Sequence, residues 1–211
     1  MYPEKNKYEN LEKLYCDYDG QYDIPKLRGC NIVECPQFIG FNYAKTTSQK
    51  DTKGVHFFID DYQFNRLWAR PDDYINLLKQ YMCVMTPDFS LYTDFPKAMQ
   101  IYNHYRKHWL GAYWESHGIK VIPTIGWSDE SSFEWCFDGE PKHSLIAVSS
   151  IGTQKSKKSK EMFLKGYSEM IKRLSPEKII FYGNIPSECR GNIVRIKAFQ
   201  EKFREVKVSE Y

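Results

Sequence analysis

From Val55 onward, short apolar runs alternate along the chain with longer segments of helical spacing. Five runs of aliphatic, β-branched and aromatic residues are predicted to be strands: VHFFI (55–59), MCVMT (82–86), KVIPTI (120–125), SLIAVSS (144–150) and KIIFYG (178–183). A sixth strand is predicted at REVKV (204–208). Strands that are apolar on both faces and separated by helices cannot pair as hairpins, so the sheet is expected to be mainly parallel.

Three of the intervening segments, residues 61–81, 95–118 and 158–176, are each long enough for a helix of four turns or more. Pro96 near a helix start and Gly118 just past a helix end follow the known preferences for helix ends. The segment NIVRIKAFQEKF, before the sixth predicted strand, is also helix-like.

The pattern therefore predicts an α/β domain over residues 55–211, with a mainly parallel sheet of five to six strands and crossover helices. An open doubly wound sheet and an incomplete barrel of the TIM type both satisfy it. Residues 1–54 are rich in Tyr, Gly, Pro and Asn and are expected to form an irregular N-terminal arm packed on the domain.

Composition narrows the class of protein. With 42% hydrophobic residues the chain of 211 residues is not expected to be disordered, and it contains no apolar run of membrane-spanning length. Its beginning resembles no secretory signal, so we expect a cytoplasmic protein without a membrane partner. Six widely spaced cysteines without a C-x-x-C pair indicate reduced, structural thiols rather than zinc ligands or disulfides.

Charge is unevenly distributed between the two parts of the chain. Residues 151–211 hold 14 Lys and Arg against 7 Asp and Glu, whereas the first 150 residues hold 16 against 20. A basic C-terminal part indicates an anionic partner.

Polar and acidic residues follow each predicted strand at the edge where parallel α/β folds bind ligands. We hypothesise that three of them are catalytic, as acid/base or metal-holding groups: Asp60, Asp61 and Asp88. The predicted substrate-binding residues are Ser90, Trp127, Asp129, Ser150, Gly152, Lys155 and Lys157. The alternative is that these Asp and Ser residues only cap helices and turns.

The segment SSIGTQKSKKSKEMF resembles a phosphate loop in outline, because a strand leads through Gly152 into a Lys-rich turn and a helix N-terminus. It is not a Walker A motif. Lys155 and Lys157 would hold a phosphate; alternatively, the lysines form a solvated face.

His104 and His108 have the i, i+4 spacing with which two imidazoles reach one metal ion. The glutamate of the H-E-x-x-H motif is missing, since position 105 is Tyr, and His117 is the only other ligand nearby in sequence. We therefore expect no metal site, and the sequence identifies no cofactor.

Several long blocks carry a family resemblance: FIGFNYA, HFFIDDYQFNRLW, PDFSLYTDFPKAMQIYNHYR, LGAYW, GIKVIPTIGWSD and FDGEPKHSLIAVSSIGT. Over residues 22–184 the chain resembles a domain of unknown function, number 4417, of Gram-positive bacteria, their phages and mobile genetic elements. The resemblance implies a mobile-element context and no mechanism.

Two function classes follow. The first is an enzyme that acts on a phosphate-bearing substrate, a nucleotide or a nucleic acid. The second is a non-catalytic module that binds nucleic acid or a host protein through the basic C-terminal part. The sequence leaves open whether the protein is an enzyme.

Overall fold

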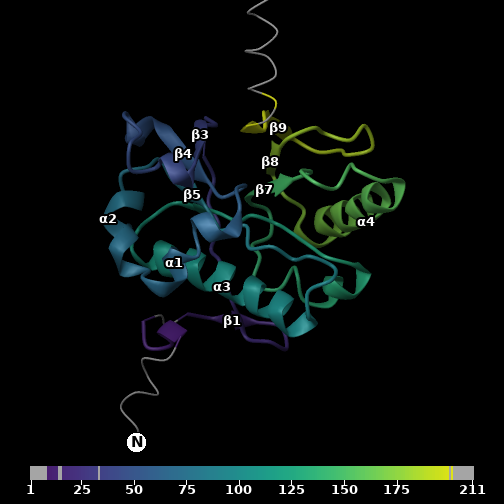
Figure 1. The fold of residues 1–211 in the computed structure, drawn as a ribbon, viewed down its shortest axis with the longest axis horizontal. Helices are drawn as coiled ribbons and strands as arrows, with labels where there is room; N and C mark the ends of the chain where they lie inside the picture. Colours follow the sequence, from purple (N-terminus) through teal and green to yellow (C-terminus); the bar gives the residue numbers. More distant parts are fainter. Residues whose placement is uncertain (1–8, 14–15, 33, 200, 202–211) are drawn as a thin grey trace, which may run out of the picture.

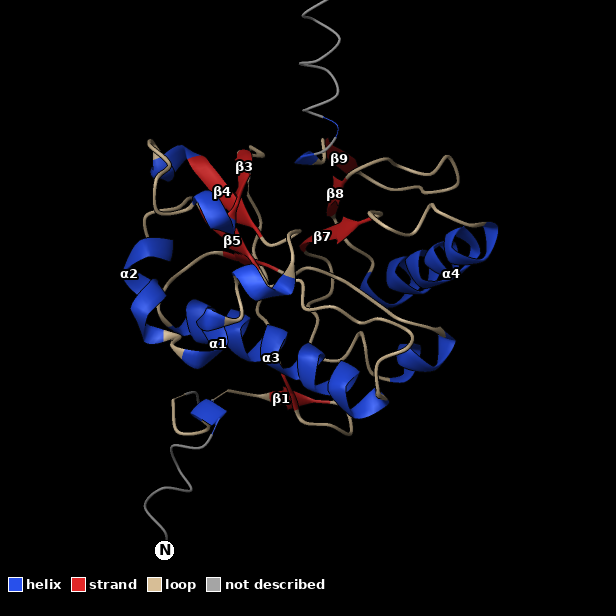
Figure 2. Cartoon of the chain, in the orientation of Figure 1, coloured by secondary structure: helices blue, strands red, loops and turns tan. Residues whose placement is uncertain are grey.

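Two parallel sheets form the centre of the computed structural model, which describes residues 9–13, 16–32, 34–199 and 201. The first sheet has the order β3-β4-β5-β6 and consists of Gln37–Gly40, Lys53–His56, Cys83–Met85 and Val121–Ile122. The second has the order β7-β8-β9 and consists of Leu145–Ser149, Lys178–Tyr182 and Ile193–Ile196. Figures 1 and 2 show the first sheet beside α1, α2 and α3, and the second beside α4.

The predicted single sheet of five to six strands is thus replaced, in the described residues, by sheets of four and three strands. The break follows from Pro123, which has no N–H to donate to a neighbouring strand. Contact between β6 and β7 narrows to one parallel bridge, Thr124 to Ala147, in which the Ile125 N–H donates to the Ala147 carbonyl at 2.8 Å. On its other side, the Thr124 N–H donates to the Thr86 hydroxyl and the Thr124 hydroxyl donates to the Thr86 carbonyl. These two side-chain hydrogen bonds take the place of a backbone ladder.

Strand order follows chain order in both sheets. The described strands lack the reversal of order that defines a doubly wound sheet, so that alternative is wrong for them. All pairings within the two sheets are parallel, as the sequence predicted.

Two strands of the parallel sheets lie where the sequence predicted none. β3 falls within the predicted irregular arm and pairs with β4 along its whole length. β9 occupies the start of the helix-like segment and pairs with β8; its Ile-Val-Arg-Ile sequence is rich in β-branched residues, which favour strands. The strand predicted at 204–208 lies outside the described residues.

Two of the predicted long helices are present, as α3 (Lys97–Ser116) and α4 (Lys157–Leu174). A capping box, in which Ser156 and Ser159 bind each other's backbone N–H, starts α4. The third, over 61–81, is instead broken into short turns because Pro71 cannot continue a helix. They are η4 (Asp61–Gln63), α1 (Arg66–Ala69), η5 (Asp72–Tyr74) and α2 (Ile75–Leu78).

Buried apolar side chains form two clusters. The first includes Trp109 and Trp114 of α3 and also takes in Leu145, Ala147 and Ile180 of the second sheet. The second cluster contains Trp135 and Phe181. A short antiparallel pair, β1 (Tyr18–Asp19) with β2 (Ile24–Pro25), packs on the outer side of α3. Within the described residues, no helix has both the length and the apolar character needed to cross a bilayer.

Candidate functional site

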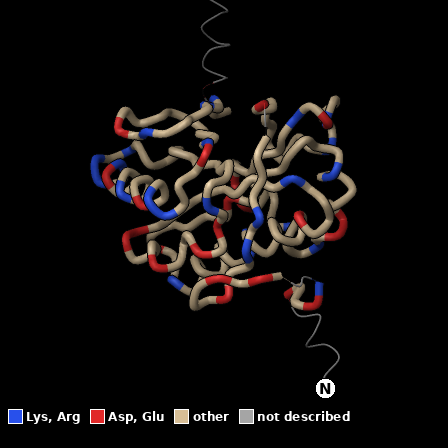
Figure 3. Tube along the Cα trace, turned by 180° about the vertical axis from the view of Figure 1, so that it is seen from behind, with Lys and Arg blue, Asp and Glu red and all other residues tan. Residues whose placement is uncertain are grey.

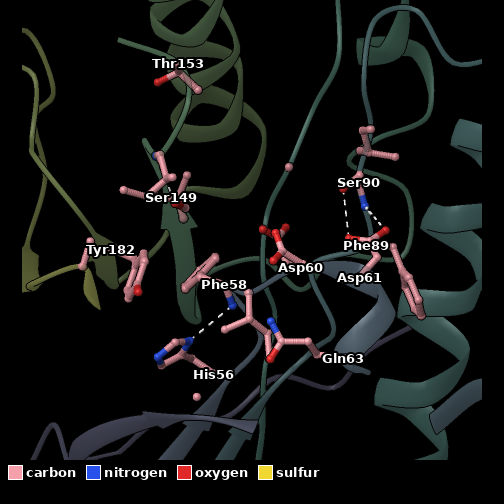
Figure 4. Close-up of a pocket in the computed structure, with 18 of the residues that line it drawn as sticks. His56, Phe58, Asp60, Asp61, Gln63, Phe89, Ser90, Ser149, Thr153 and Tyr182 are labelled. Atoms are coloured by element: carbon pink, nitrogen blue, oxygen red, sulfur yellow. Dashed lines mark hydrogen bonds between the residues drawn. The ribbon is translucent and has the colours of Figure 1, made fainter. Parts of the chain in front are cut away.

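A cavity of about 780 Å³ opens at the carboxyl ends of the strands. Its walls come from the residues that end or follow β3, β4, β5, β7, β8 and β9 and the loop after β6. Figure 4 shows residues from both sheets facing this space. A volume of this size holds a small organic molecule.

The three carboxylates proposed as catalytic, Asp60, Asp61 and Asp88, all line this cavity. Asp61 is held in place, because its two oxygens accept hydrogen bonds from the Ser90 backbone N–H at 3.0 Å and the Ser90 hydroxyl at 2.9 Å. The two hydrogen bonds between Asp61 and Ser90 join the loop after β4 to the loop after β5. Asp60 precedes η4 but makes no capping hydrogen bond, and it is exposed.

Asp88 is partly buried, and its carboxylate lies near Gly126, in the loop after the neighbouring strand β6. Burial raises the pKa of Asp88 to about 7; the negative charge of Asp61 adds to the increase and the ammonium of Lys107 opposes it. A carboxyl group whose pKa lies near neutrality can either donate or accept a proton around pH 7.

Aromatic rings form much of the wall around the acids. At the end of β4, His56 Nδ1 accepts a hydrogen bond from the Phe58 N–H at 3.2 Å. The Tyr182 ring lies 4.9 Å from the His56 ring and 4.7 Å from the Phe58 ring, measured between centroids. The described residues that line the cavity include no Lys or Arg.

The predicted binding residues divide into two groups. Ser90 and Trp127 line the cavity. The others do not, although their neighbours Ser149, Ile151 and Thr153 do; they are Asp129, Ser150, Gly152, Lys155 and Lys157.

Local hydrogen bonds occupy two of these outer residues. Asp129 caps η6 (Glu130–Glu134) by accepting the Ser131 N–H at 3.0 Å, and the hydrogen bond from the Ser131 side chain lowers its pKa. The Ser150 hydroxyl donates to the Asn184 carbonyl at 2.6 Å. Asp129 thus follows the capping alternative, whereas the Ser150 hydrogen bond joins the loop after β7 to the loop after β8.

The basic loop at the start of α4 carries partly compensated charge. Lys160 pairs with Glu188 at 2.7 Å, and Lys157 approaches Glu161 at 3.9 Å. Figure 3 shows acidic residues interspersed among the basic ones along α4. Lys155 and Lys158 are exposed and have no ion pair with any described residue.

The sequence pattern does not predict the roles of two polar residues, His56 and Glu140. His56 lies within an apolar strand, although a histidine at the end of a parallel strand is itself a signal of a site. Glu140 lies in the loop before β7, and its carboxylate is buried against His108 and Lys107. Only the fold brings it to α3.

Comparison with known proteins places this α/β chain in a family. The model of that family, described as Domain of unknown function (DUF4417), matches residues 16–200, so the chain belongs to it. The resemblance seen in the sequence blocks is thus confirmed.

Two phage proteins are similar to the chain. The Gene 1 protein of Mycobacterium phage L5 is 41% identical over 167 residues, which cover 78% of this chain and 72% of the phage protein. The Gene 1 protein of Mycobacterium phage D29 is 36% identical over 180 residues, which cover 84% of this chain and 66% of the phage protein. No solved structure matches the chain.

Proposed function

We propose that the protein is an enzyme that performs acid–base chemistry on a small molecule bound in the cavity, with Asp88 as the group that transfers the proton. The observation that carries the proposal is the position of Asp88, a cavity-lining carboxyl group whose pKa burial raises to about 7. Titratable groups shifted towards neutrality inside a cavity are concentrated at catalytic sites.

The other two acids have different roles in this proposal. Asp61 is a positioning residue, since Ser90 occupies both of its oxygens. Asp60 is exposed to the cavity without a capping bond and is available to contact the substrate.

The walls favour a substrate with a flat ring. Aromatic side chains such as Phe58, Tyr182 and Trp127 offer faces for stacking, and the carboxylates of Asp60 and Asp88 can accept N–H or O–H groups. A phosphate group beside these carboxylates would be repelled. In a phosphate-bearing substrate such as a nucleotide, the ring would therefore lie in the cavity and the phosphate at the rim near Thr153, on the loop that continues to Lys155 and Lys157.

Binding and turnover of matched nucleosides and nucleoside monophosphates test this proposal, with calorimetry for affinity and mass spectrometry for products. We expect D88N to abolish turnover while the ring still binds, and K155A/K157A to weaken only the phosphorylated ligand. D73N, which replaces an exposed acid outside the cavity, is the control. Turnover that survives in D88N, or binding by neither ligand class, would contradict the proposal.

Nucleic-acid or host-protein binding through the start of α4 is the second candidate function. It is favoured by the two lysines that lack an acidic partner among the described residues, Lys155 and Lys158. Glu161 and Glu188 partly neutralise Lys157 and Lys160. We therefore favour the enzymatic function in the cavity over this binding function.

A further inference from the structure

A buried cluster of imidazoles and a carboxylate lies inside the fold, apart from the residues that line the cavity. His104 and His108 face the same way from consecutive turns of α3, with ring centroids 4.4 Å apart. Glu140 reaches them from the loop before β7, and its Oε1 lies 3.0 Å from His108 Nε2. One ligand atom from each of the three residues lies within 4.8 Å of the other two.

Backbone carbonyls determine which nitrogen of each ring carries the proton. His108 Nδ1 lies 2.9 Å from the Pro25 carbonyl, and His104 Nε2 lies 3.1 Å from the Asp138 carbonyl. A carbonyl only accepts, so these two nitrogens are the donors. In the neutral rings the lone pairs are then on His108 Nε2 and His104 Nδ1. An N–H bound to a backbone carbonyl on one side and a lone pair on the other is the usual arrangement of a metal-binding histidine.

The lone pairs have no donor to satisfy them. His104 Nδ1 and Glu140 Oε2 are buried and make no hydrogen bond to any described residue. His108 Nε2 faces a carboxylate oxygen, which is itself an acceptor. A proton shared between His108 and Glu140 would make that one contact favourable but would leave His104 Nδ1 and Glu140 Oε2 unsatisfied.

We propose that His104 Nδ1, His108 Nε2 and the Glu140 carboxylate bind a divalent transition-metal ion, for which Zn²⁺ is the best match. Two imidazoles and one carboxylate form a common zinc donor set, with a water molecule as fourth ligand. Lys107 supports the arrangement by donating to Glu140 Oε1 at 2.6 Å and to the Thr124 carbonyl at 2.9 Å. It thereby orients the carboxylate and leaves Oε2 for the metal.

This site departs from the expectation of no metal that the sequence alone supported. The i, i+4 spacing of the histidines predicts two ligands, but neither the H-E-x-x-H pattern nor His117 supplies the third. Glu140 is 32 residues beyond His108, and no local spacing connects the two.

The test begins with metal analysis of the untagged full chain, followed by chelation and reloading with Zn²⁺ or Co²⁺. We expect about one ion per chain, a Co²⁺ d–d spectrum typical of low coordination number, and X-ray absorption that shows two imidazoles in the first shell. Reloading at about a hundredfold excess over Kd should raise Tm by about 5–10 °C.

Variants locate the ion. E140Q keeps the shape of the side chain but weakens it as a ligand, so it should lose most of the metal; H117A, at the end of the same helix, should bind as the wild type does. Because buried variants can fail to fold, the wild-type X-ray absorption spectrum stands as an independent measurement. Less than about 0.1 ion per chain after equilibration with Zn²⁺ and no change in Tm would overturn the proposal, as would a first shell without imidazole.

Discussion

Three aspartates at one rim differ in what surrounds them, and their surroundings separate their roles. Asp61 binds the Ser90 backbone and hydroxyl, Asp60 is exposed, and Asp88 is partly buried with a pKa raised to about 7 by burial. The sequence placed all three at the rim because each follows a strand. It did not distinguish them, because burial and hydrogen bonding are tertiary properties.

Replacement of Asp88 by Asn should change how stability depends on pH. The folded carboxyl group has a pKa of about 7, raised above the ordinary value of 3.8 by burial. Between these two values the folded state keeps a proton that the unfolded state has released, so the free energy of unfolding of the wild type falls as pH rises through this window. D88N lacks this loss and should be more stable than the wild type by about 2 kcal/mol near pH 8, and similar to it near pH 4.

Urea denaturation at a series of pH values measures this difference. D60N, the exposed neighbour, is the control and should change the free energy of unfolding by no more than about 0.5 kcal/mol at any pH. Wild-type and D88N curves that run parallel from acid to alkaline pH would show that Asp88 does not retain its proton in the fold.

At the scale of elements, helices with clear ends were predictable, whereas the strands β3 and β9 were not. Pro96 and Gly118 bracket α3, and the capping box starts α4, so local sequence determines both. β3 and β9 are each an outer strand of a sheet. The sequence of β3 resembles a loop and that of β9 resembles a helix, so neither is recognised as a strand from its local pattern alone. Strand pairing between distant segments supplies what the local pattern lacks.

Close packing of α4 against the loop after β6 predicts the effect of adding one methyl group. A Cβ at Gly166 would lie 2.2 Å from Nε1 of Trp127, whose ring also contacts Phe163. Ala stabilises a helix more than Gly does, but the cost of overpacking against Trp127 is expected to be larger. G166A should therefore destabilise the fold by about 1–3 kcal/mol. S168A, on the exposed face of the same helix, should instead leave stability unchanged or raise it by about 0.5 kcal/mol. Thermal unfolding of both variants measures the contrast, and equal stabilisation would show that Trp127 moves away at no cost.

The lysines at the start of α4 give a quantitative test of nucleic-acid binding. Lys155 and Lys158 have no ion pair among the described residues, so each would release about one counterion on contact with phosphate. K155A/K158A should lower the slope of log K against log salt concentration by about two. The matched control is K79A/K142A, which removes two exposed lysines elsewhere. Fluorescence anisotropy with a labelled duplex measures the slope. No binding by the wild type at low salt, or the same slope in both double variants, would exclude this loop as the interface.

At the scale of the whole molecule, the sequence predicted a parallel α/β fold with its site at the strand ends, and the structure has parallel sheets and a cavity there. What it did not predict is the narrow junction of the two sheets. The junction depends on Pro123, which lies inside an apolar run that otherwise resembles an uninterrupted strand. Glu140 was missed for a related reason, since only the packed fold brings its loop beside α3.

Because the junction between the two sheets is narrow, it is important to know whether they unfold together. The labelling rate of one buried cysteine in each apolar cluster tests this. Cys83 belongs to the first apolar cluster and Cys136 to the second, and burial raises the pKa of each thiol to about 12. Neither thiol can react with iodoacetamide until its surroundings open, because the reactive form is the thiolate. The cavity draws its walls from both sheets, so we expect one cooperative unit in which Cys83 and Cys136 are labelled at rates within about twofold of each other at every urea concentration. Peptide mass spectrometry reports each site separately, and the less buried Cys35 should react earlier. Labelling of Cys136 at a urea concentration that still protects Cys83 would show that the second sheet opens alone, and that the cavity can lose one wall while the other remains folded.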